Sequence, residues 1–474
     1  MKKNILLEKK TKIVATIGPA TEQKGMLKGL IEAGLDVVRL NFSHGSHDEH
    51  QLRLTNARAL SKELNKQVAV LQDLSGPKIR LGEFYKDRVI LKEGDDFLLT
   101  TEKIVGDENK AYLSYAALPK EVKAGDFILL DDGKKKLQVV KTSATEIKTK
   151  IIIGGETKGR RGVNVPGVDL GISSLTEKDR KDLEFGLKND VDFIALSFVR
   201  RPSDVKELRA ILKKRKSKAL IVAKIETQQA VDMIDDIIAV ADAVMVARGD
   251  LAIEIGAEYV PMVQKSIIQK CNAYGKPVIT ATQMLESMIN TAVPTRAEVS
   301  DVANAIIDGT DAVMLSEETT LGKFPREAIE VMSRIALEVE NKCKRTNDFP
   351  GVQGSIIVDT VSGAVAFTAD EIGAKLIVAL THRGTTPRMI SRFKPKQPIL
   401  AFTLDERASH QLALSYGVTP IRMKTVTRLG DAAKYVRDYL IKNKVLVKGE
   451  SFVLTAGLPL GTAVQTNSLI VETL

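Results

Sequence analysis

Polar and charged residues follow most of the short Val-, Ile- and Ala-rich runs of this chain. Six of eight such runs end in side chains that can do chemistry: Arg39, Asn41, Ser43 and His44; Asp73; Lys224 and Glu226; Arg248, Gly249 and Asp250; Thr280, Thr282 and Gln283; and Ser316, Glu317 and Glu318. A single residue of this kind usually only meets solvent. Six groups on one rim predict an active site instead, because the carboxyl ends of parallel strands meet at one face.

The pair Glu226 and Asp250 predicts a site for a hard divalent cation. Mg²⁺ is usually held by one or two carboxylates together with substrate oxygens. Lys224 comes two residues before Glu226 and points to the same side of its strand, since side chains alternate along a strand. An ammonium group in this place indicates stabilisation of a transferring phosphoryl group or of an enolate. The alternative for Lys224 and Glu226 is an ordinary salt bridge within one strand.

The stretch LQDLSGPKIR places Asp73, Lys78 and Arg80 around a Gly-Pro corner where the third run ends. A surface loop can produce such a cluster by chance, whereas an active site requires it. The elements around the corner decide between the two.

Eight apolar runs alternate with segments of helical periodicity, which is typical of repeated β-α units. The runs are KIVATIG, DVVRLNF, QVAVLQD, DFIALSF, ALIVAKIE, AVMVARGD, PVITATQ and AVMLSEE. Eight strands, each followed by a helix, predict an α/β fold with a closed (β/α)8 barrel.

More than a hundred residues separate the third run from the fourth, and they differ in character. RVILKEGDDFLLTT, DFILLDDGKKKLQVV and EIKTKIIIGG collect β-forming residues around Gly, Asp and Lys turns. We predict an inserted antiparallel β-barrel domain at 77–170 that acts as a lid over the mouth of the barrel. The catalytic barrel then comprises 1–76 and 171–345. The β-α pattern restarts as a C-terminal α/β domain at 346–474.

Composition limits the class of protein. The chain has 474 residues, of which 44% are hydrophobic and 27% charged, and its net charge is +10. A basic balance suits anionic ligands such as phosphates. Aromatic residues make up only 4%, so we expect no nucleic-acid platform, although the charge leaves salt-dependent binding open. Two distant cysteines, Cys271 and Cys343, and the lack of a signal-peptide core or membrane span predict a cytoplasmic protein with no membrane contact.

Together these stretches resemble the pyruvate kinase family. The resemblance covers essentially the whole chain, through TKIVATIGPA, AGLDVVRLNFSHGSHDEH, GPKIRLG, GVNVPGVDL, AKIET, VARGDLAIEIG, TATQMLESMI, DVANAIIDGTDAVMLSEET and SFVLTAGLPLGTAVQTNSLIV. It implies the glycolytic transfer of a phosphoryl group from phosphoenolpyruvate to ADP with Mg²⁺, or Mn²⁺ in its place. Protonation of the enolate then gives pyruvate, with ATP as the other product. The resemblance also implies a homotetramer.

The resemblance assigns roles to single residues. It implies catalytic roles for Arg39, Lys224, Thr282 and Ser316; substrate binding by Arg39, Lys224, Gly249, Asp250 and Thr282; Mg²⁺ binding by Glu226 and Asp250; and nucleotide binding by Asn41, His44, Arg80 and Arg161. Thr282 and Ser316 would form a water-linked proton path, because a threonine hydroxyl alone is too weak an acid. Arg161 stands where a Lys is common, and Glu317 replaces an expected Gly.

Asn41, Ser43, Asp73, Leu74 and Lys78 correspond to the region that binds K⁺ in the better-known relatives. Leu74 takes the place of a Thr, and Lys78 that of a Glu. We predict that the Lys78 ammonium supplies the charge that K⁺ supplies elsewhere, pairing with carboxylates such as Asp73, so that K⁺ is not required. The alternative is that Lys78 merely begins the lid.

The stretch THRGTTPRMISRF predicts a loop that opens a helix, a natural phosphate cradle. The resemblance implies a sugar-phosphate effector site on this loop, formed by Thr381, His382, Arg383, Gly384, Thr385 and Thr386. An ordinary helix cap is the alternative.

Two other functions remain open. A Mg²⁺-dependent aldolase or lyase that stabilises pyruvate enolate would not need the lid or the cluster of Arg39, Asn41 and Ser43. A non-catalytic sugar-phosphate sensor would be expected to have lost Lys224 or the carboxylates, and all are present.

Overall fold

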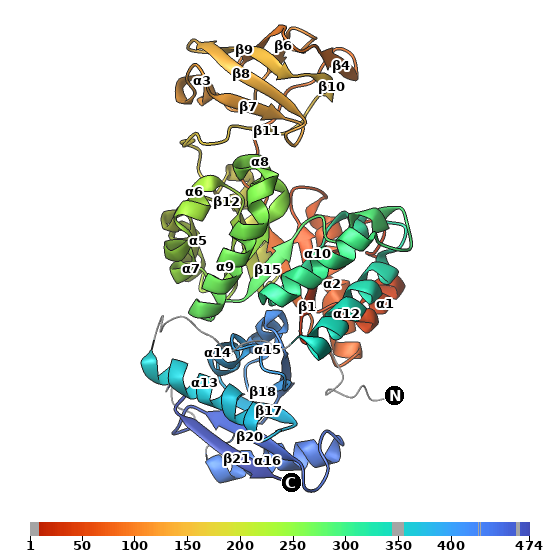
Figure 1. Ribbon diagram of the computed structural model, residues 1–474, viewed down its shortest axis with the longest axis vertical. Coiled ribbons are helices and arrows are strands. Elements are labelled where there is room, and N and C mark those ends of the chain that lie inside the picture. The colour runs from red at the N-terminus through yellow and green to blue at the C-terminus, as the bar shows by residue number, and fades with distance from the viewer. Residues whose placement is uncertain (1–8, 344–354, 425, 427, 461–464) are drawn as a thin grey trace.

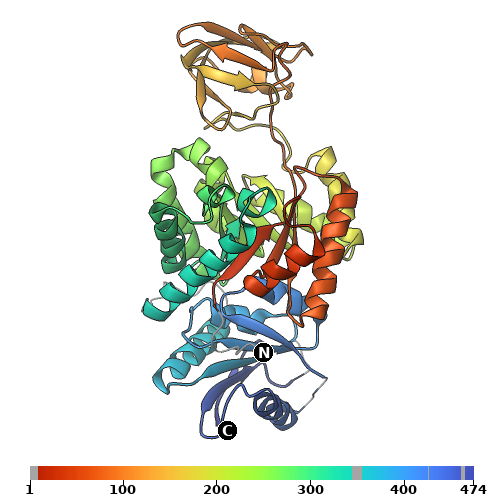
Figure 2. The same ribbon diagram turned by 90° about the vertical axis from the view of Figure 1, so that its right-hand side faces the viewer.

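The computed structural model describes residues 9–343, 355–424, 426, 428–460 and 465–474. Three bodies stack along the long axis, with a small β domain at one end, a barrel in the middle and a second α/β domain at the other end (Figures 1 and 2). The expected boundary at 345/346 and part of the C-terminal stretch GLPLGTAVQTN lie outside the described residues.

The predicted eight strands close into a parallel barrel, so the fold class is confirmed. The strands are β1 (Lys12–Thr16), β2 (Val37–Asn41), β3 (Ala69–Asp73), β12 (Phe193–Val199), β13 (Leu220–Ile225), β14 (Ala243–Ala247), β15 (Val278–Ala281) and β16 (Ala312–Leu315). They pair in the order β1-β16-β15-β14-β13-β12-β3-β2, and each ladder is parallel. All eight carboxyl ends therefore face the same rim.

Helices surround the barrel and turn the chain back between strands. They are α1 (Lys24–Ala33), α2 (His47–Glu63), α4 (Glu177–Lys188), α5 (Pro202–Lys214), α6 (Gln228–Asp232), α7 (Ile234–Val240), α8 (Arg248–Ile255), α9 (Val260–Tyr274), α10 (Arg296–Asp308), α11 (Glu317–Thr320) and α12 (Pro325–Lys342), with the 3₁₀ turns η2 (Ala257–Tyr259) and η3 (Glu286–Ile289). Capping boxes begin α2, α4 and α10, where a Ser or Thr hydroxyl and a Glu or Asp three residues later satisfy the free amides.

The inserted domain has a hydrophobic core of its own, which includes Phe97, Leu99, Ile128 and Leu137. Its elements are β4 (Arg88–Leu91), β5 (Asp96–Thr100), β6 (Lys110–Tyr112), α3 (Leu118–Glu121), β7 (Phe127–Leu130), β8 (Lys135–Thr142), β9 (Glu146–Ile153), β10 (Gly155–Lys158) and β11 (Val163–Asn164). This core is separate from that of the barrel, and two chain segments join the domain to the barrel.

The ladders of this domain are antiparallel, as predicted, except that β5 and β6 pair in parallel. The strands form a six-stranded sheet, β11-β7-β8-β9-β5-β6, and the two-stranded sheet β10-β4. Isolated bridges, such as Arg80–Gly162 and Leu81–Leu113, lie outside these strands.

The C-terminal domain is an α/β layer with the sheet order β19-β18-β17-β20-β21. It contains α13 (Ile356–Glu371), β17 (Leu376–Thr381), α14 (Thr385–Ser391), β18 (Ile399–Thr403), α15 (Glu406–Gln411), η4 (Leu412–Leu414), β19 (Val418–Arg422), α16 (Leu429–Lys442), β20 (Ser451–Ala456) and β21 (Ser468–Thr473). Ala413 and Leu414 join the buried cluster inside the barrel, so this domain closes the rim opposite the strand ends. Within the described residues, no helix is long and apolar enough to cross a membrane.

Candidate active site

A buried carboxylate lies at the centre of the barrel mouth. Asp73 is the last residue of β3 and is only 1% exposed. Arg39 Nε donates to Asp73 Oδ2 at 2.7 Å, and Lys224 Nζ lies 3.3 Å from Asp73 Oδ1. Burial alone would raise the pKa of Asp73, but the Lys224 and Arg39 charges hold it below its ordinary value. Asp73 is therefore a fixed negative charge that orients two cations toward the mouth.

Lys224 connects this carboxylate to the predicted metal site. Its Nζ donates to Ser197 Oγ at 2.7 Å and lies 3.0 Å from Glu226 Oε1. Burial would lower the pKa of Lys224, yet the neighbouring Asp73 and Glu226 raise it above its ordinary value. The salt bridge considered as the alternative for Lys224 and Glu226 is thus present, but as one contact of a network that keeps the ammonium charged in a buried place.

An irregularity in β12 serves the same network. The register of β12 against β13 shifts between Leu196 and Val199, and Phe198 has a φ of 52°. A bulky residue with positive φ is a genuine outlier, and bulges of this kind often lie beside active sites. Here the bulge turns the Phe198 N–H toward Glu226 Oε2, at 2.7 Å. Ser197 donates to the Leu74 carbonyl at 2.7 Å, which ties β12 to the end of β3.

Glu226 and Asp250 fit a divalent cation that also takes substrate oxygens. Glu226 follows β13 and is 1% exposed, and burial raises its pKa, with the nearby Asp250 charge adding to the rise although Lys224 opposes it. Two neighbouring carboxylates of like charge gain from a shared cation. Among the described residues no group of three or more His, Cys, Asp or Glu side chains forms a metal cage. Mg²⁺ is commonly bound by one or two carboxylates together with water or substrate oxygens.

Lys78 has a different partner from the one expected. Its Nζ lies 3.8 Å from Asp250 Oδ1, across the junction of lid and barrel. Lys78 therefore pairs with a nearby carboxylate, but this is Asp250 and not Asp73, whose two oxygens face Arg39 and Lys224. Lys78 thus places its charge beside one of the two predicted Mg²⁺ ligands.

The remaining residues of the expected K⁺ region lie together at the ends of β2 and β3. Asn41 Oδ1 accepts from the Ser43 N–H at 3.1 Å, and Ser43 Oγ lies 3.4 Å from Ser75 Oγ. The Leu74 side chain is 1% exposed and offers no oxygen to this group.

The residues expected on the nucleotide side form a basic surface between barrel and lid. His44 is exposed, and its pKa is lowered by partial burial and by the positive charges of Arg80, Lys78 and Arg39. A neutral imidazole among cations is suited to an anionic ligand, which would relieve the crowding of positive charge.

Two further cations of this surface come from the lid side. Arg80 Nη1 donates to the Arg160 carbonyl at 3.3 Å, and Arg161 Nε lies 3.3 Å from Asp131 Oδ1. The Arg80 contact is long and exposed, and the Arg161 side chain is 46% exposed, although its partner Asp131 is largely buried.

The loops after β15 and β16 contain the expected proton path. Thr282 Oγ1 accepts from the Gly249 N–H at 2.9 Å and donates to the Ala281 carbonyl at 2.6 Å. Glu318, which is buried, accepts from the Ser316 N–H at 2.7 Å and from the Leu285 N–H at 3.2 Å. The Glu318 carboxylate therefore joins the Ser316 loop to the loop that carries Thr282.

Comparison with known proteins decides the family. The family model described as "Pyruvate kinase, barrel domain" matches residues 8–329, and "Pyruvate kinase, alpha/beta domain" matches residues 359–472. The chain belongs to the pyruvate kinase family. Members of this family are glycolytic phosphotransferases that depend on Mg²⁺, and phosphoenolpyruvate and ADP are the substrates expected from it.

Individual relatives agree with the family model. The chain is 44% identical over 471 residues to a pyruvate kinase of Staphylococcus epidermidis, covering 97% of this chain and 80% of that protein. It is 45% identical to "Pyruvate kinase 2" of Synechocystis, covering 98% of this chain and 79% of the relative. The crystal structure of a pyruvate kinase from Cryptosporidium parvum superposes with a TM-score of 0.92 at 34% identity, over 99% of this chain and 97% of that one.

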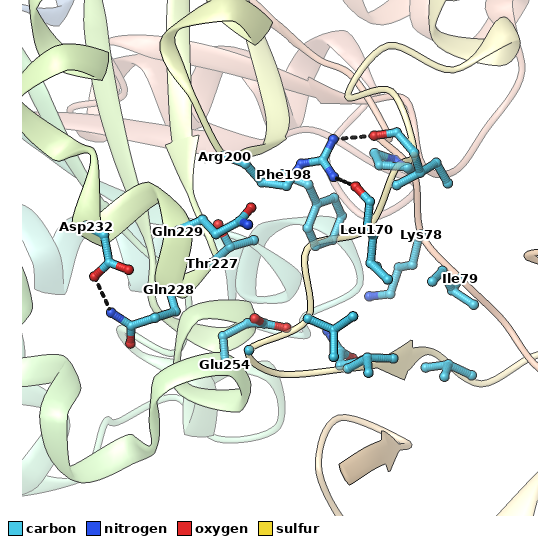
Figure 3. A pocket seen from close by; sticks show the side chains of 17 residues that line it. Lys78, Ile79, Leu170, Phe198, Arg200, Thr227, Gln228, Gln229, Asp232 and Glu254 are labelled. Carbon is cyan, nitrogen blue, oxygen red and sulfur yellow. Dashed lines mark hydrogen bonds between the residues drawn. The ribbon is translucent and has the colours of Figure 1, made fainter. Parts of the chain in front are cut away.

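A cavity lies between the lid and the barrel, beside the two segments that join them. The cavity has a volume of ≈ 170 Å³, is partly open to solvent, and includes Lys78, Phe198 and Glu254 in its wall (Figure 3). The Arg200 guanidinium donates to the Leu170 and Ile172 carbonyls and so holds the segment by which the chain returns from the lid.

Gly76 explains the Gly-Pro corner on the outgoing segment. Its φ is +68°, and a Cβ there would lie 2.8 Å from Ser197 Cβ and 2.9 Å from Phe198 Cδ2. Only glycine fits this turn, which packs directly on the β12 bulge. The corner is therefore packed against the end of β12, next to the Asp73 network, and is not a free surface loop.

The loop expected to bind an effector lies at the start of α14. Gly384 adopts a left-handed conformation, and its N–H donates to Thr381 Oγ1 at 3.0 Å. Thr386 Oγ1 pairs with Thr466 Oγ1 at 2.7 Å, while the His382 carbonyl accepts from Thr403. Arg383 and Thr385 are exposed, so the loop keeps a cation and a hydroxyl at the surface.

Sequence reasoning missed the ends of the first and fourth strands. Thr16, at the end of β1, accepts from Arg39 Nη1 at 2.7 Å. Ser197, near the end of β12, bonds with Lys224. Both are polar residues near the carboxyl end of a strand, as in the other six groups. Thr16 in KIVATIG and Ser197 in DFIALSF could therefore have been predicted in the same way. The role of Glu318 in joining the loops of Ser316 and Leu285 was also not predicted.

Glu254 gives a prediction that needs no ligand. Its pKa is raised from 4.5 to about 7 by burial and by the Asp250 charge, against a hydrogen bond from Asn164 of the lid. Between these two values the folded protein keeps a proton that the unfolded chain releases, so stability falls as pH rises through this window. Glu254→Gln removes that loss. Between pH 4.5 and pH 8, the free energy of unfolding of the variant should therefore rise by about 1–3 kcal/mol relative to that of the wild type.

Calorimetric melting without Mg²⁺ at pH 4.5 and pH 8 measures this gain. Glu258→Gln changes an exposed carboxyl nearby and is the matched control. If the free energies of unfolding of Glu254→Gln and wild type differed by the same amount at both pH values, the prediction would be contradicted.

Proposed function

We propose that this protein transfers the phosphoryl group of phosphoenolpyruvate to ADP and releases pyruvate and ATP. The observation that carries the proposal is the Lys224 ammonium, kept charged among Asp73, Glu226 and Ser197 at the end of β13. A buried, oriented ammonium is what a phosphoryl group in flight requires, because such catalysis is mainly positioning and charge stabilisation.

The phosphoryl transfer uses the two cations that Asp73 orients. The bond between phosphorus and the enol oxygen of phosphoenolpyruvate breaks, and a bond to the terminal oxygen of ADP forms. Arg39 binds the phosphoryl oxygens in the ground state, and Lys224 follows them as charge spreads in the transition state. Glu226 and Asp250 would hold Mg²⁺, or Mn²⁺ in its place, which when bound neutralises charge on the phosphoryl oxygens and the enolate.

The enolate then takes a proton at its terminal carbon and becomes the pyruvate methyl group. Thr282 is the nearest candidate on the β15 loop, and it hands on the proton through water that Ser316 helps to hold. Its Oγ1 now takes the Gly249 N–H. A substrate carboxylate at the amides of Gly249 and Asp250 would displace this contact and free the hydroxyl.

ADP fits the basic surface between barrel and lid. Arg80 and Arg161 pair there only through exposed contacts, and Asn41 and His44 complete the surface on the barrel side. The lyase and sensor alternatives leave these cations and the lid without a role. A cytoplasmic location remains a prediction.

Pyruvate release from phosphoenolpyruvate and ADP with Mg²⁺ tests the function. Lys224→Met removes the ammonium and should lower kcat by about 10²–10³-fold. Lys270→Met, which removes a lysine paired on the surface with Asp235, should leave kcat unchanged. Because Lys224→Met strands two buried carboxylates, circular dichroism must confirm its fold, and Thr282→Ala offers a milder second variant. A folded wild-type protein without activity would reject the proposal.

We also propose that Lys78 makes the enzyme independent of K⁺. Three features support this: Leu74 offers no oxygen ligand, Asp73 is already neutralised by two cations, and Lys78 adds a fixed charge beside Asp250. A monovalent cation in this region would meet the positive charge of Lys78, where the resemblance to the family implies a glutamate.

Activity in a buffer free of K⁺ and NH₄⁺ measures this independence. Wild type should reach full kcat there, and K⁺ should change it by less than about twofold. In that buffer, kcat of the double variant Leu74→Thr, Lys78→Glu should fall by about tenfold or more, because a positive charge near the phosphoryl group is missing. Added K⁺ should restore kcat. Lys92→Glu, on the exposed lid surface, is the control. Strong activation of wild type by K⁺ would contradict the proposal.

We propose a sugar-phosphate effector on the loop Thr381–Thr386 and a homotetramer. The exposed Arg383 and Thr385 and the left-handed Gly384 support the first. Exposed apolar side chains support the second: Tyr259, Met262 and Val293 on the barrel, and Ile356, Ile357 and Phe367 on and beside the outer face of α13. Surfaces of this kind usually mark contacts between proteins.

Titration with fructose bisphosphate, glucose 6-phosphate and ribose 5-phosphate tests the effector site. At least one of them should lower the apparent KM for phosphoenolpyruvate, by about 5–150-fold, which is the usual range of such coupling. The matched variant Thr385→Ala should respond less. A flat response to all three compounds would contradict the proposal.

A further inference from the structure

The loop that carries Thr282 is strained. Thr282 has a φ of 70° and Gln283 a φ of 53°. Two successive residues other than glycine in the left-handed region are rare, and a β-branched threonine is the least tolerant of it. Such a conformation costs free energy and persists only where neighbouring contacts impose it.

Arg248 holds this left-handed conformation through the backbone carbonyls of the loop. Its Nη2 donates to the Thr282 carbonyl at 2.8 Å, and its Nε donates to the Ala281 carbonyl at 3.3 Å. The next residue along, Gly249, donates its N–H to Thr282 Oγ1 at 2.9 Å. The first residues of α8 thus hold both the backbone and the hydroxyl of Thr282.

Asp301 fixes the guanidinium in turn. Its two carboxylate oxygens accept from Arg248 Nη1 and Nη2, each at 2.7 Å. This bidentate pair has a defined plane, which a lysine could not reproduce. Asp301 lies on α10, whose Glu298 also accepts from the Ser287 N–H at 2.7 Å. Two carboxylates of one helix therefore anchor the segment between β15 and α10.

We propose that Arg248, anchored by Asp301, is a positioning residue for the proton-transfer step. It keeps Thr282 in its left-handed conformation so that the hydroxyl is directed at the substrate carboxylate site. The inference rests on the proposed function, because it assumes that Thr282 passes the proton to the enolate. Neither Arg248 nor Asp301 needs to touch the transferring phosphoryl group.

The two chemical steps should then separate in a variant. Asp301→Asn leaves the Arg248 fork with a neutral partner, and the loop is free to relax toward a right-handed φ. The hydroxyl of Thr282 would move away from the enolate carbon, whereas Arg39, Lys224 and Asp73 stay in place. Protonation slows, and phosphoryl transfer is spared.

Exchange of pyruvate methyl protons with D₂O measures the proton step by itself. With Mg²⁺ and ATP present, a methyl C–H bond breaks, the proton passes to solvent, and a C–D bond forms on return, which NMR detects without net turnover. Asp301→Asn should exchange about tenfold or more slowly than wild type, which is less than the roughly 10²–10⁴-fold that one acid–base group contributes, because Thr282 itself is still present. Its KM values for phosphoenolpyruvate and ADP should stay within about twofold. Asp301→Glu, which keeps the carboxylate, should recover part of the exchange.

Asp235→Asn is the matched control, since it neutralises an aspartate on α7 that pairs with Lys270 away from the mouth. Arg248→Lys serves as the second variant if Asp301→Asn fails to fold, and it should show the same selective loss of exchange. Unchanged exchange in either folded variant, or a proportional loss of exchange and substrate affinity that Asp301→Glu does not rescue, would overturn the inference. A wild-type protein that forms no pyruvate would instead reject the proposed function.

Discussion

Asp73 is a fully buried carboxylate, and the mouth of the barrel depends on how its charge is balanced. Arg39 and Lys224 each take one of its oxygens, and Thr16 and Ser197 bind the far sides of those two cations. Removing one partner from a buried ionic network costs several kcal/mol, because the remaining charge is left unpaired. The network therefore fixes β1, β2, β3, β12 and β13 relative to one another before any substrate arrives.

The short helix α8 is the second organising element. Its first residue, Arg248, grips the loop after β15; Asp250 faces Lys78; and Glu254 lies against Asn164 of the lid. One helix thus reaches the proton path, the predicted Mg²⁺ site and the inserted domain. The contacts of α8 therefore connect the inserted domain with the predicted Mg²⁺ ligand Asp250 and with the loop that carries Thr282.

The eight strands could be predicted because each is a short apolar run, and because a parallel strand buried on both faces has little room for polar residues. The strand-end rule then located Arg39, Asp73, Lys224, Glu226, Asp250, Thr282 and Ser316 on one rim, where the structure has them. The same rule would have identified Thr16 and Ser197, which lie inside apolar runs and were read as part of the strand. The inserted β domain was predicted from its β-forming runs, whereas its division into a six-stranded and a two-stranded sheet was not.

The sequence by itself determined the barrel, the insertion, the C-terminal domain and the family, since these depend on local periodicity and on ordered motifs. Only the tertiary structure decided which charges meet. Lys78 pairs with Asp250 and not Asp73, Arg248 finds its anchor in Asp301, and the Phe198 bulge turns an amide toward Glu226. These partners are far apart in the chain, and an ion pair or a strained backbone angle depends on distances of a few ångströms, which no local pattern encodes.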